Sequence, residues 1–203
     1  MKLVRTFIQA GALAALFSAT SAQAALILYT DRAAFDAATT GTVVEPYTAP
    51  LNSFTEISNT TYNGIGYSSD TYLVDPGYSP TLYQWNSGAV LLIDSPATLT
   101  FGASTAFAAD FGTILGQANN VTVTINGIAT VISTSLRPEL SFYGWTSTDP
   151  ITSVQISTSA DYLILDNVTR ARRAPPVDVP EPDSIALLGL GLLGLALSRK
   201  RRA

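Results

Sequence analysis

Apolar and polar residues alternate in short runs through the middle of the chain, and Gly, Asn, Asp, Ser or Pro separates the runs. Residues 121–125 (VTVTI) and 128–132 (IATVI) show this alternation well, and only Asn126-Gly127 lies between them. A period of two in β-branched residues is typical of strands with one buried face. Asn-Gly supplies the two positive φ values of a type I′ turn. We therefore predict a β-hairpin here, within a longer series of short strands.

One segment departs from this pattern. Residues 32–38 (RAAFDAA) favour a short helix, and Thr30 or Asp31 can cap its first turn. Many short strands with a single helix, in a middle region of about 150 residues, are typical of a two-sheet β-sandwich. The predicted fold is therefore all-β, a sandwich of jelly-roll type with one short N-terminal helix.

The N-terminus has the pattern of a secretory signal peptide. Lys2 and Arg5 precede a mostly apolar stretch, residues 7–17, and small residues follow at Ala22 and Ala24. This small-x-small pattern predicts cleavage between Ala24 and Ala25. Residues 1–24 are then the signal peptide, and the Sec translocon and signal peptidase are implied partners.

The C-terminus combines a rigid turn, an apolar run and a basic cluster. Residues 184–198 carry no charge, and at 1.5 Å per residue they would form a helix of roughly 22 Å, short for a bilayer core of about 30 Å. The basic cluster should stay in the cytoplasm. We predict a passenger at residues 25–169, a linker at 170–179 and a tail at 180–203 with a hydrophobic helix. The turn is Val179, Pro180, Glu181 and Pro182, and the basic cluster is Arg199, Lys200, Arg201 and Arg202.

This tail resembles the PEP-CTERM sorting signal of Gram-negative bacteria that produce exopolysaccharide. The Pro180-Glu181-Pro182 turn, the Gly/Leu-rich run and the terminal Arg/Lys cluster carry the resemblance. It implies processing by exosortase, a membrane-embedded protease/transpeptidase. It also implies an inner-membrane intermediate, followed by the cell surface or the extracellular matrix. The same type of tail is also described as an ice-binding-protein C-terminus, which says nothing about ice binding by this chain.

Three stretches of the passenger resemble β-sandwich domains related in shape to carbohydrate-binding modules. They are residues 29–35 (YTDRAAF), 106–112 (AFAADFG) and 165–168 (LDNV). The resemblance implies a sandwich fold and does not establish a ligand.

Composition narrows the possible chemistry. Residues 25–179 contain five arginines and 13 acidic residues, a net charge of −8, so we expect no binding to nucleic acid. The chain contains no Cys and no His. Disulfides, Ser-His-Asp triads and His-ligated zinc are therefore excluded, which disfavours an enzyme.

Asp166 and Asn167 lie within a predicted strand. Alternation places Leu163, Leu165 and Asn167 on one face and Asp166 on the other, so one of the two polar side chains is expected to be buried. Asp110, in another strand, is a possible partner. Three interpretations stay open: structural hydrogen bonding, a calcium site formed by Asp110, Asp166 and Asn167, or contact with a ligand.

Aromatic residues are dense between residues 62 and 85. Tyr78, Tyr83 and Trp85 are the candidates for a sugar-binding platform, because aromatic rings stack on sugars. The more common alternative is that such rings fill the core of the sandwich.

The sequence thus predicts an exported surface or matrix protein that is not an enzyme. We expect it to associate with exopolysaccharide, and carbohydrate binding is one form of that association. The alternatives are a polysaccharide hydrolase that uses two carboxylates, and an inert structural passenger.

Overall fold

The computed structural model describes residues 25–68, 70–79, 81–82, 85, 88–94, 96–114, 119–158 and 162–175. Within these residues the chain forms antiparallel β-strands, one short α-helix, α2 (Arg32–Ala37), and a 3-10 turn, η1 (Pro76–Tyr78). The prediction of an all-β domain with one short helix is confirmed. The strands, in chain order, are β1 (Leu26–Tyr29), β2 (Thr39–Glu45), β3 (Phe54–Glu56), β4 (Thr61–Tyr62), β5 (Ile65–Tyr67), β6 (Thr71–Val74), β7 (Val90–Ile93), β8 (Ala97–Thr113), β9 (Asn120–Ile125), β10 (Ile128–Ser133), β11 (Ser141–Thr158) and β12 (Leu163–Arg173).

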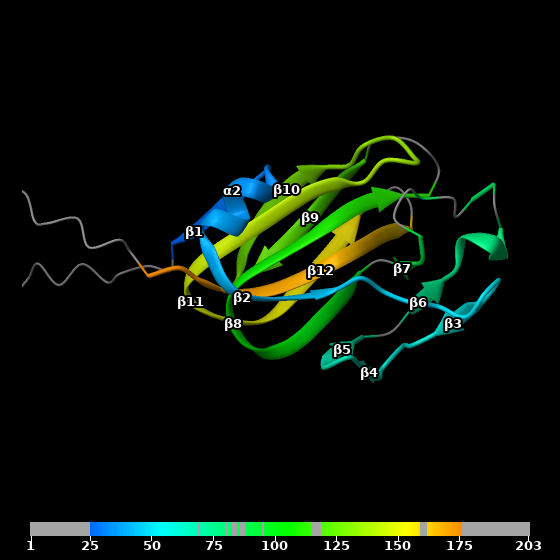
Figure 1. Ribbon diagram of the computed structural model, residues 1–203, viewed down its shortest axis with the longest axis horizontal. Helices are drawn as coiled ribbons and strands as arrows, with labels where there is room; N and C mark the ends of the chain where they lie inside the picture. The colour runs from blue at the N-terminus through cyan, green and yellow to red at the C-terminus, as the bar shows by residue number, and fades with distance from the viewer. Residues whose placement is uncertain are drawn as a thin grey trace, which may run out of the picture. The chain divides into compact units, whose positions relative to one another are not determined.

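Hydrogen bonds join these strands into one continuous sheet rather than the two separate sheets that the sequence predicts. The main order is β10-β9-β11-β8-β12-β7-β6-β3, while β1 pairs with β11, β2 with β12, and β5 with both β4 and β8 (Figure 1). The two longest strands, β8 and β11, belong to both halves of this sheet. Their register shifts between Thr146 and Ser153. Bulges of this kind bend a strand, so the continuous sheet folds over at this point.

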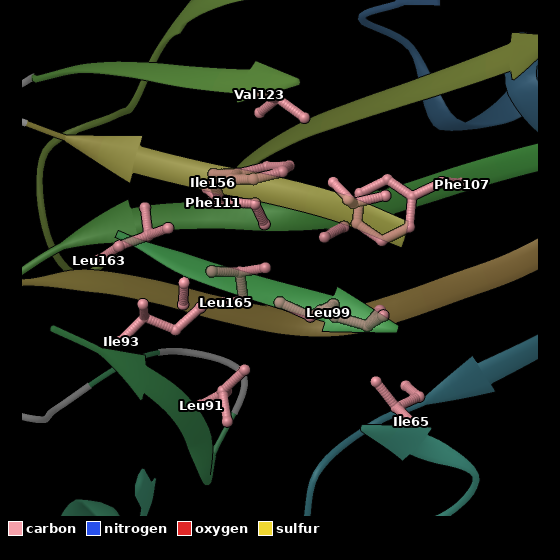
Figure 2. Packing of buried hydrophobic residues seen from close by; sticks show 14 of the residues in the cluster. Ile65, Leu91, Ile93, Leu99, Phe107, Phe111, Val123, Ile156, Leu163 and Leu165 are labelled. Carbon is pink, nitrogen blue, oxygen red and sulfur yellow. The ribbon is translucent and has the colours of Figure 1, made fainter. Parts of the chain in front are cut away.

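The main hydrophobic core lies between the two halves of the folded sheet. Figure 2 shows Val123 of β9 and Ile156 of β11 above side chains such as Leu165 of β12, all in one cluster. Leu99 and Phe107 show why β8 belongs to both halves: both are fully buried in this cluster, although they lie in different parts of the strand. Each such side chain contributes about 1.5–3 kcal/mol through burial.

Both local elements that the sequence predicts are present. The β9–β10 hairpin turns at Asn126 (φ 52°) and Gly127 (φ 77°), and Ile125 pairs with Ile128. Asp31 caps α2 by accepting a hydrogen bond from the Ala34 amide at 2.8 Å. The helix then buries Phe35 on the outer side of the sheet, where Phe35 packs against a small cluster of alanines: Ala106, Ala108 and Ala171.

The predicted boundary between passenger and linker is wrong by four residues. Strand β12 continues to Arg173, and Arg170, Arg172 and Arg173 pair with β2. Ala171 is buried beneath α2, and the Arg173 amide donates to Thr105 Oγ1 at 2.6 Å. These arginines look like a charged linker in sequence, but their backbones complete the sheet while their side chains reach the surface.

Candidate functional site

A groove of about 340 Å³ opens on the outer face of β5 and the first half of β8. Its lining contains hydroxyl and amide side chains and no charged group. The lining residues are Asn59, Thr60, Thr61, Gly66, Tyr67, Ser68, Thr98 and Thr100.

Alternation along β8 places the threonines in this groove. Ala97, Leu99 and Phe101 face the core, so Thr98 and Thr100 between them face outward. The loop after β5 holds the floor of the groove: the Thr98 amide donates to Ser68 Oγ at 2.9 Å, and the Ser68 amide donates to the Thr98 carbonyl at 3.1 Å. The hydroxyl groups therefore stand on a rigid strand pair.

Gly66 makes room for one hydroxyl group of the groove lining. It pairs with Thr100 across the two strands, and Thr100 Oγ1 donates to the Gly66 carbonyl at 3.4 Å. A Cβ atom at Gly66 would overlap the Thr100 hydroxyl. Glycine at this position thus leaves room for the Thr100 hydroxyl that lines the groove.

The uncharged surface continues from the groove across the sheet. Thr98 lies opposite Gln155 and Thr100 opposite Ser153, while Gln155 lies in turn opposite Thr124 of β9. Strands β4, β5, β9 and β10 contain no charged residue, and neither do residues 97–104 or 151–158. We call this surface, centred on Thr98, Thr100, Gln155 and Thr124, the hydroxyl face. It offers many neutral donors and acceptors within a domain of strongly acidic composition.

The structure does not bring the three predicted ligand-binding aromatics together on an exposed face. Trp85 is only 4% exposed and packs with Val90, Leu92 and Ile164 in a second core cluster. Gly112 makes room for it, since a Cβ atom there would meet the Trp85 ring. Trp85 therefore belongs to the core and cannot serve as a stacking platform.

The two tyrosines predicted together with Trp85 are not known to be buried as Trp85 is. Tyr78 is 52% exposed, and its ring packs against Phe54 with 5.1 Å between the centroids. Tyr83 lies outside the described residues. Among the described residues, Tyr78 is therefore the exposed ring of the predicted platform, and it packs against Phe54 of β3.

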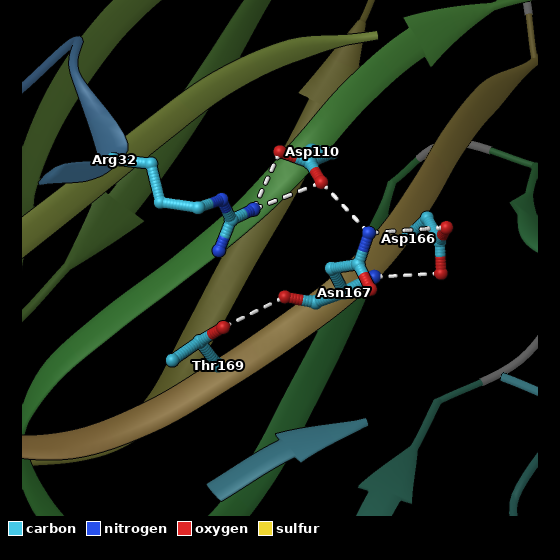
Figure 3. A network of polar contacts seen from close by, with 5 residues as sticks. All are labelled: Arg32, Asp110, Asp166, Asn167 and Thr169. Atoms are coloured by element: carbon cyan, nitrogen blue, oxygen red, sulfur yellow. Dashed lines mark hydrogen bonds and ion pairs between the residues drawn. The ribbon is translucent and has the colours of Figure 1, made fainter. Parts of the chain in front are cut away.

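The predicted polar cluster does form. Asn167 Nδ2 donates to Asp110 Oδ2 at 2.9 Å and to Asp166 Oδ2 at 3.3 Å, so the amide bridges two carboxylates that lie opposite each other on β8 and β12 (Figure 3). Arg32 Nη2 approaches both oxygens of Asp110, at 2.8 and 2.9 Å. The guanidinium also lies 4.4 Å from the centre of the Phe142 ring. This network joins α2 to the sheet.

The predicted faces of β12 are partly wrong. Asn167 has a positive φ of 49°, and the register shifts between Asp166 and Thr169. This bulge restarts the alternation, so Val168, and not Asn167, shares the main core with Leu163 and Leu165. Asp166 is the buried residue of the pair, 1% exposed, and its Oδ1 accepts a 2.7 Å hydrogen bond from the backbone N–H of Asn167.

These residues do not fit the calcium site proposed from sequence. A calcium ion needs converging oxygen ligands, but Asp110 faces a guanidinium and the NH₂ group of Asn167. Among the described residues, no group of three or more His, Cys, Asp or Glu side chains could hold a metal ion. The geometry favours the hydrogen-bonding interpretation of Asp166 and Asn167.

The terminal signals fall outside the described residues, which include neither the predicted signal peptide at 1–24 nor the turn, apolar run and basic cluster at 179–202. Comparison with family models matches residues 178–202 to the PEP-CTERM protein-sorting motif. The chain carries a PEP-CTERM sorting signal. This signal implies that the protein is exported and processed by an exosortase. In the part of the chain that the structure describes, no helix is long and apolar enough to cross a membrane.

Other comparisons say little about the domain of this PEP-CTERM protein. No curated protein is significantly similar to it. One solved structure with some similarity is a family 6 carbohydrate-binding module whose binding sub-sites were dissected. Its TM-score is 0.36 at 15% identity, over 58% of this chain and 92% of that chain. With so low a TM-score, the similarity supports no conclusion about the fold or a ligand.

The groove residues were not among the candidates from sequence. Thr98 and Thr100 alternate with apolar residues in a charge-free stretch, which is the one signal available beforehand. That signal does not reveal that Thr61, Gly66 and Ser68 lie beside them, because this depends on which strands pair.

Proposed function

We propose that this PEP-CTERM protein is a cell-surface or extracellular-matrix component that binds a neutral polysaccharide through the hydroxyl face. The domain would act as a jelly-roll-type binding module, and exopolysaccharide would be its partner. The observation that carries the proposal is the uncharged, hydroxyl-lined groove at Thr98 and Thr100 in a domain of net charge −8.

The chemistry of the groove suits neutral sugars. Sugar hydroxyls both donate and accept hydrogen bonds, as do the Thr, Ser and Asn side chains in the lining. No buried charge has to be desolvated when a neutral chain binds, whereas an anionic polymer would be repelled by the acidic domain. A ligand held by these groups would contact several hydroxyls at once and would bind modestly.

The hydrolase alternative receives less support from this groove. Hydrolysis of a glycosidic bond by the usual route needs two carboxylates that flank it, roughly 5–10 Å apart. The groove lining contains no Asp or Glu. The carboxylate pair Asp110 and Asp166 is held by Asn167 and Arg32, away from this lining.

A glycan array tests the proposal with the full chain, purified in detergent and labelled with a fluorophore. We expect saturable binding to neutral glycans, equal in calcium and in EDTA. The double substitution of Thr98 and Thr100 by Val should weaken it about tenfold, since it removes two hydroxyls at nearly constant volume. The control Thr55→Val removes an exposed hydroxyl on β3, outside the hydroxyl face, and should bind like the native chain.

A second pair of variants tests whether the groove lining must stay in place. Gly66→Val would displace the Thr100 hydroxyl that lines the groove, while Gly102→Val adds the same side chain on β8 where no atom lies within 4 Å. Only the first should abolish binding. If the folded native chain binds no neutral glycan, or if both pairs behave alike, the proposal is wrong and an inert structural role is favoured. Release of reducing sugar would instead favour the hydrolase.

A further inference from the structure

Strand β10 is an open edge of the sheet that nothing in its sequence protects. Among the described strands it ends the strand order and pairs only with β9, over all six residues from Ile128 to Ser133. It contains no Pro, no charge and no bulge, and residues 111–136 are free of charge altogether. Exposed edges of this kind pair with other strands unless charge, Pro or a bulge prevents it.

The other open edges differ from β10 in the described part of the chain. Strand β3 has three residues and includes Glu56, and β4 has two residues. Strand β1 has four residues. Strand β2 is long enough but contains Gly41 at φ 62° and pairs with β12 across a register shift. β10 is therefore the edge best suited to accept another strand.

The hairpin geometry shows which backbone groups of β10 are available. In a two-residue turn the flanking residues, Ile125 and Ile128, form a hydrogen-bonded pair. Because such pairs alternate with non-hydrogen-bonded ones, the N–H and C=O groups of Ala129, Val131 and Ser133 point away from β9. The Ser133 carbonyl already accepts the Tyr143 hydroxyl at 2.7 Å. A carbonyl oxygen has a second lone pair, so the N–H and C=O groups of Ala129, Val131 and Ser133 all remain for an incoming strand.

We propose that β10 pairs with β10 of a second copy of this chain, antiparallel and around a two-fold axis at Val131. In this register Val131 faces Val131 of the other copy, and Ala129 faces Ser133. The register is the one that matches the available groups on both strands. It also covers the Val131 side chain, which is 63% exposed in a single copy.

A second copy suits this edge better than an unrelated strand. An antiparallel strand pair is isologous, so one residue set satisfies both sides. The acidic composition would make two copies repel, but the charge-free edge keeps like charges away from the contact. The pairing is small, so the association should be weak, and it would extend the hydroxyl face across two copies. The pairing itself does not depend on glycan binding.

Cysteine trapping tests the register, because the natural chain has no Cys. The full chain in detergent carries a single substitution and is oxidised with copper-phenanthroline. Val131→Cys should form a covalent dimer, since hydrogen-bonded pairs have Cα atoms about 5.5 Å apart, within disulfide range. Ala129→Cys and Ser133→Cys should each stay monomeric, because each lies roughly 13 Å from its own copy. A mixture of the Ala129→Cys and Ser133→Cys chains should form a covalent dimer of one chain of each kind, because these two residues face each other in the proposed register.

Leu51→Cys is the control, since Leu51 is 82% exposed and lies in the turn before β3, the strand at the opposite end of the sheet order from β10. We expect Val131→Cys to crosslink at least about tenfold faster than this control. Dimers formed through the C-terminal tail would crosslink both variants alike, which would overturn the proposal. So would a mixture of Ala129→Cys and Ser133→Cys that gives no mixed dimer.

Sedimentation provides a measurement without a disulfide. The sedimentation coefficient of the native chain should rise with concentration. Val131→Lys should remove that rise by placing two like charges opposite each other, while Leu51→Lys should leave it unchanged. A native coefficient that is constant with concentration, or a rise that survives Val131→Lys, would contradict the pairing.

Discussion

At the scale of single residues, Asn167 has two functions that other residue types cannot combine. Its backbone adopts a positive φ, which Asn tolerates better than most residues, and its amide donates to two carboxylates. Without that donor, Asp110 and Asp166 would face each other across β8 and β12 with no amide group between the two carboxylates. Asn167 thus stabilises the fold, because its amide group reduces the repulsion between two carboxylates.

We predict that Asn167→Asp lowers the free energy of unfolding by about 2 kcal/mol or more at pH 7, because it replaces the bridging donor by a third carboxylate. Thermal unfolding at pH 7 measures this. Asn167→Gly is the control that keeps the positive φ and adds no charge; an equal loss in both variants would contradict the electrostatic explanation.

Tyr47 and Tyr67 provide the second residue-scale prediction. Their hydroxyls lie 3.1 Å apart in the core, and burial raises the pKa of both groups above the usual value of about 10. A raised pKa in the folded state means that the stability is fully present below pH 10 and is lost as the pH rises above it. We expect the melting temperature to fall between pH 10 and 11.

Tyr67→Phe should weaken that fall, because one of the two buried phenols can no longer ionise on unfolding. It should also cost about 1 kcal/mol at pH 7 through the lost hydrogen bond. Absorbance at 295 nm reports phenolate formation in the same samples. If the folded native chain gives a larger phenolate signal at pH 10 than the folded Tyr67→Phe chain, Tyr67 ionises in the folded state and the prediction is wrong.

At the scale of elements, α2 shows how a six-residue helix can be held in place. Such a helix is too short to be stable alone, and it is held by the Asp31 cap, by the Arg32 ion pair and by Phe35, which is fully buried. Gly144 of β11 provides the space for that ring, since a Cβ atom there would overlap it. The helix and the strand therefore depend on each other.

We predict that Gly144→Ala destabilises the domain by about 1–3 kcal/mol, because the added methyl group displaces Phe35 from the sheet. The matched control is Gly102→Ala on β8, where no atom lies within 4 Å of the new Cβ atom. Chemical denaturation of both variants measures the difference. A Gly144→Ala chain as stable as the control would show that Phe35 adapts and that α2 is not held in this way.

At the scale of the whole molecule, β12 closes the domain. It pairs with β8, β7 and β2 and supplies residues to all three hydrophobic clusters. Its last residues are also the arginines that precede the sorting signal. The domain therefore ends only where the chain leads into the tail, and the functional boundary is Arg173.

We predict that a chain ending at Pro175 folds and that one ending at Thr169 does not. The shorter chain loses the pairing of Arg170, Arg172 and Arg173 with β2, together with buried Ala171, which should cost several kcal/mol of a total of about 5–15. Soluble yield and a cooperative melting transition measure this. A cooperative transition in the shorter chain at the same temperature would restore the boundary predicted from sequence.

The sequence by itself determined the features that depend on neighbouring residues. The Asn126-Gly127 turn, the Asp31 cap and the strand periodicity act within a few residues, so local chemistry was enough to predict them. The sorting signal at residues 178–202 is likewise a linear pattern. The signal peptide and the cleavage site at Ala24 stay predictions of the same kind.

Only the tertiary structure decided which residues meet and which face each strand buries. A single bulge at Asn167 exchanged the faces of β12, so Val168 took the core position that simple alternation gave to Asn167. Trp85 became a core residue because Gly112, far along the chain, leaves room for its ring. The groove exists because β5 pairs with β8 in the register that sets Gly66 beside Thr100. Such contacts depend on strand pairing and on bulges, and period-two patterns are compatible with many pairings.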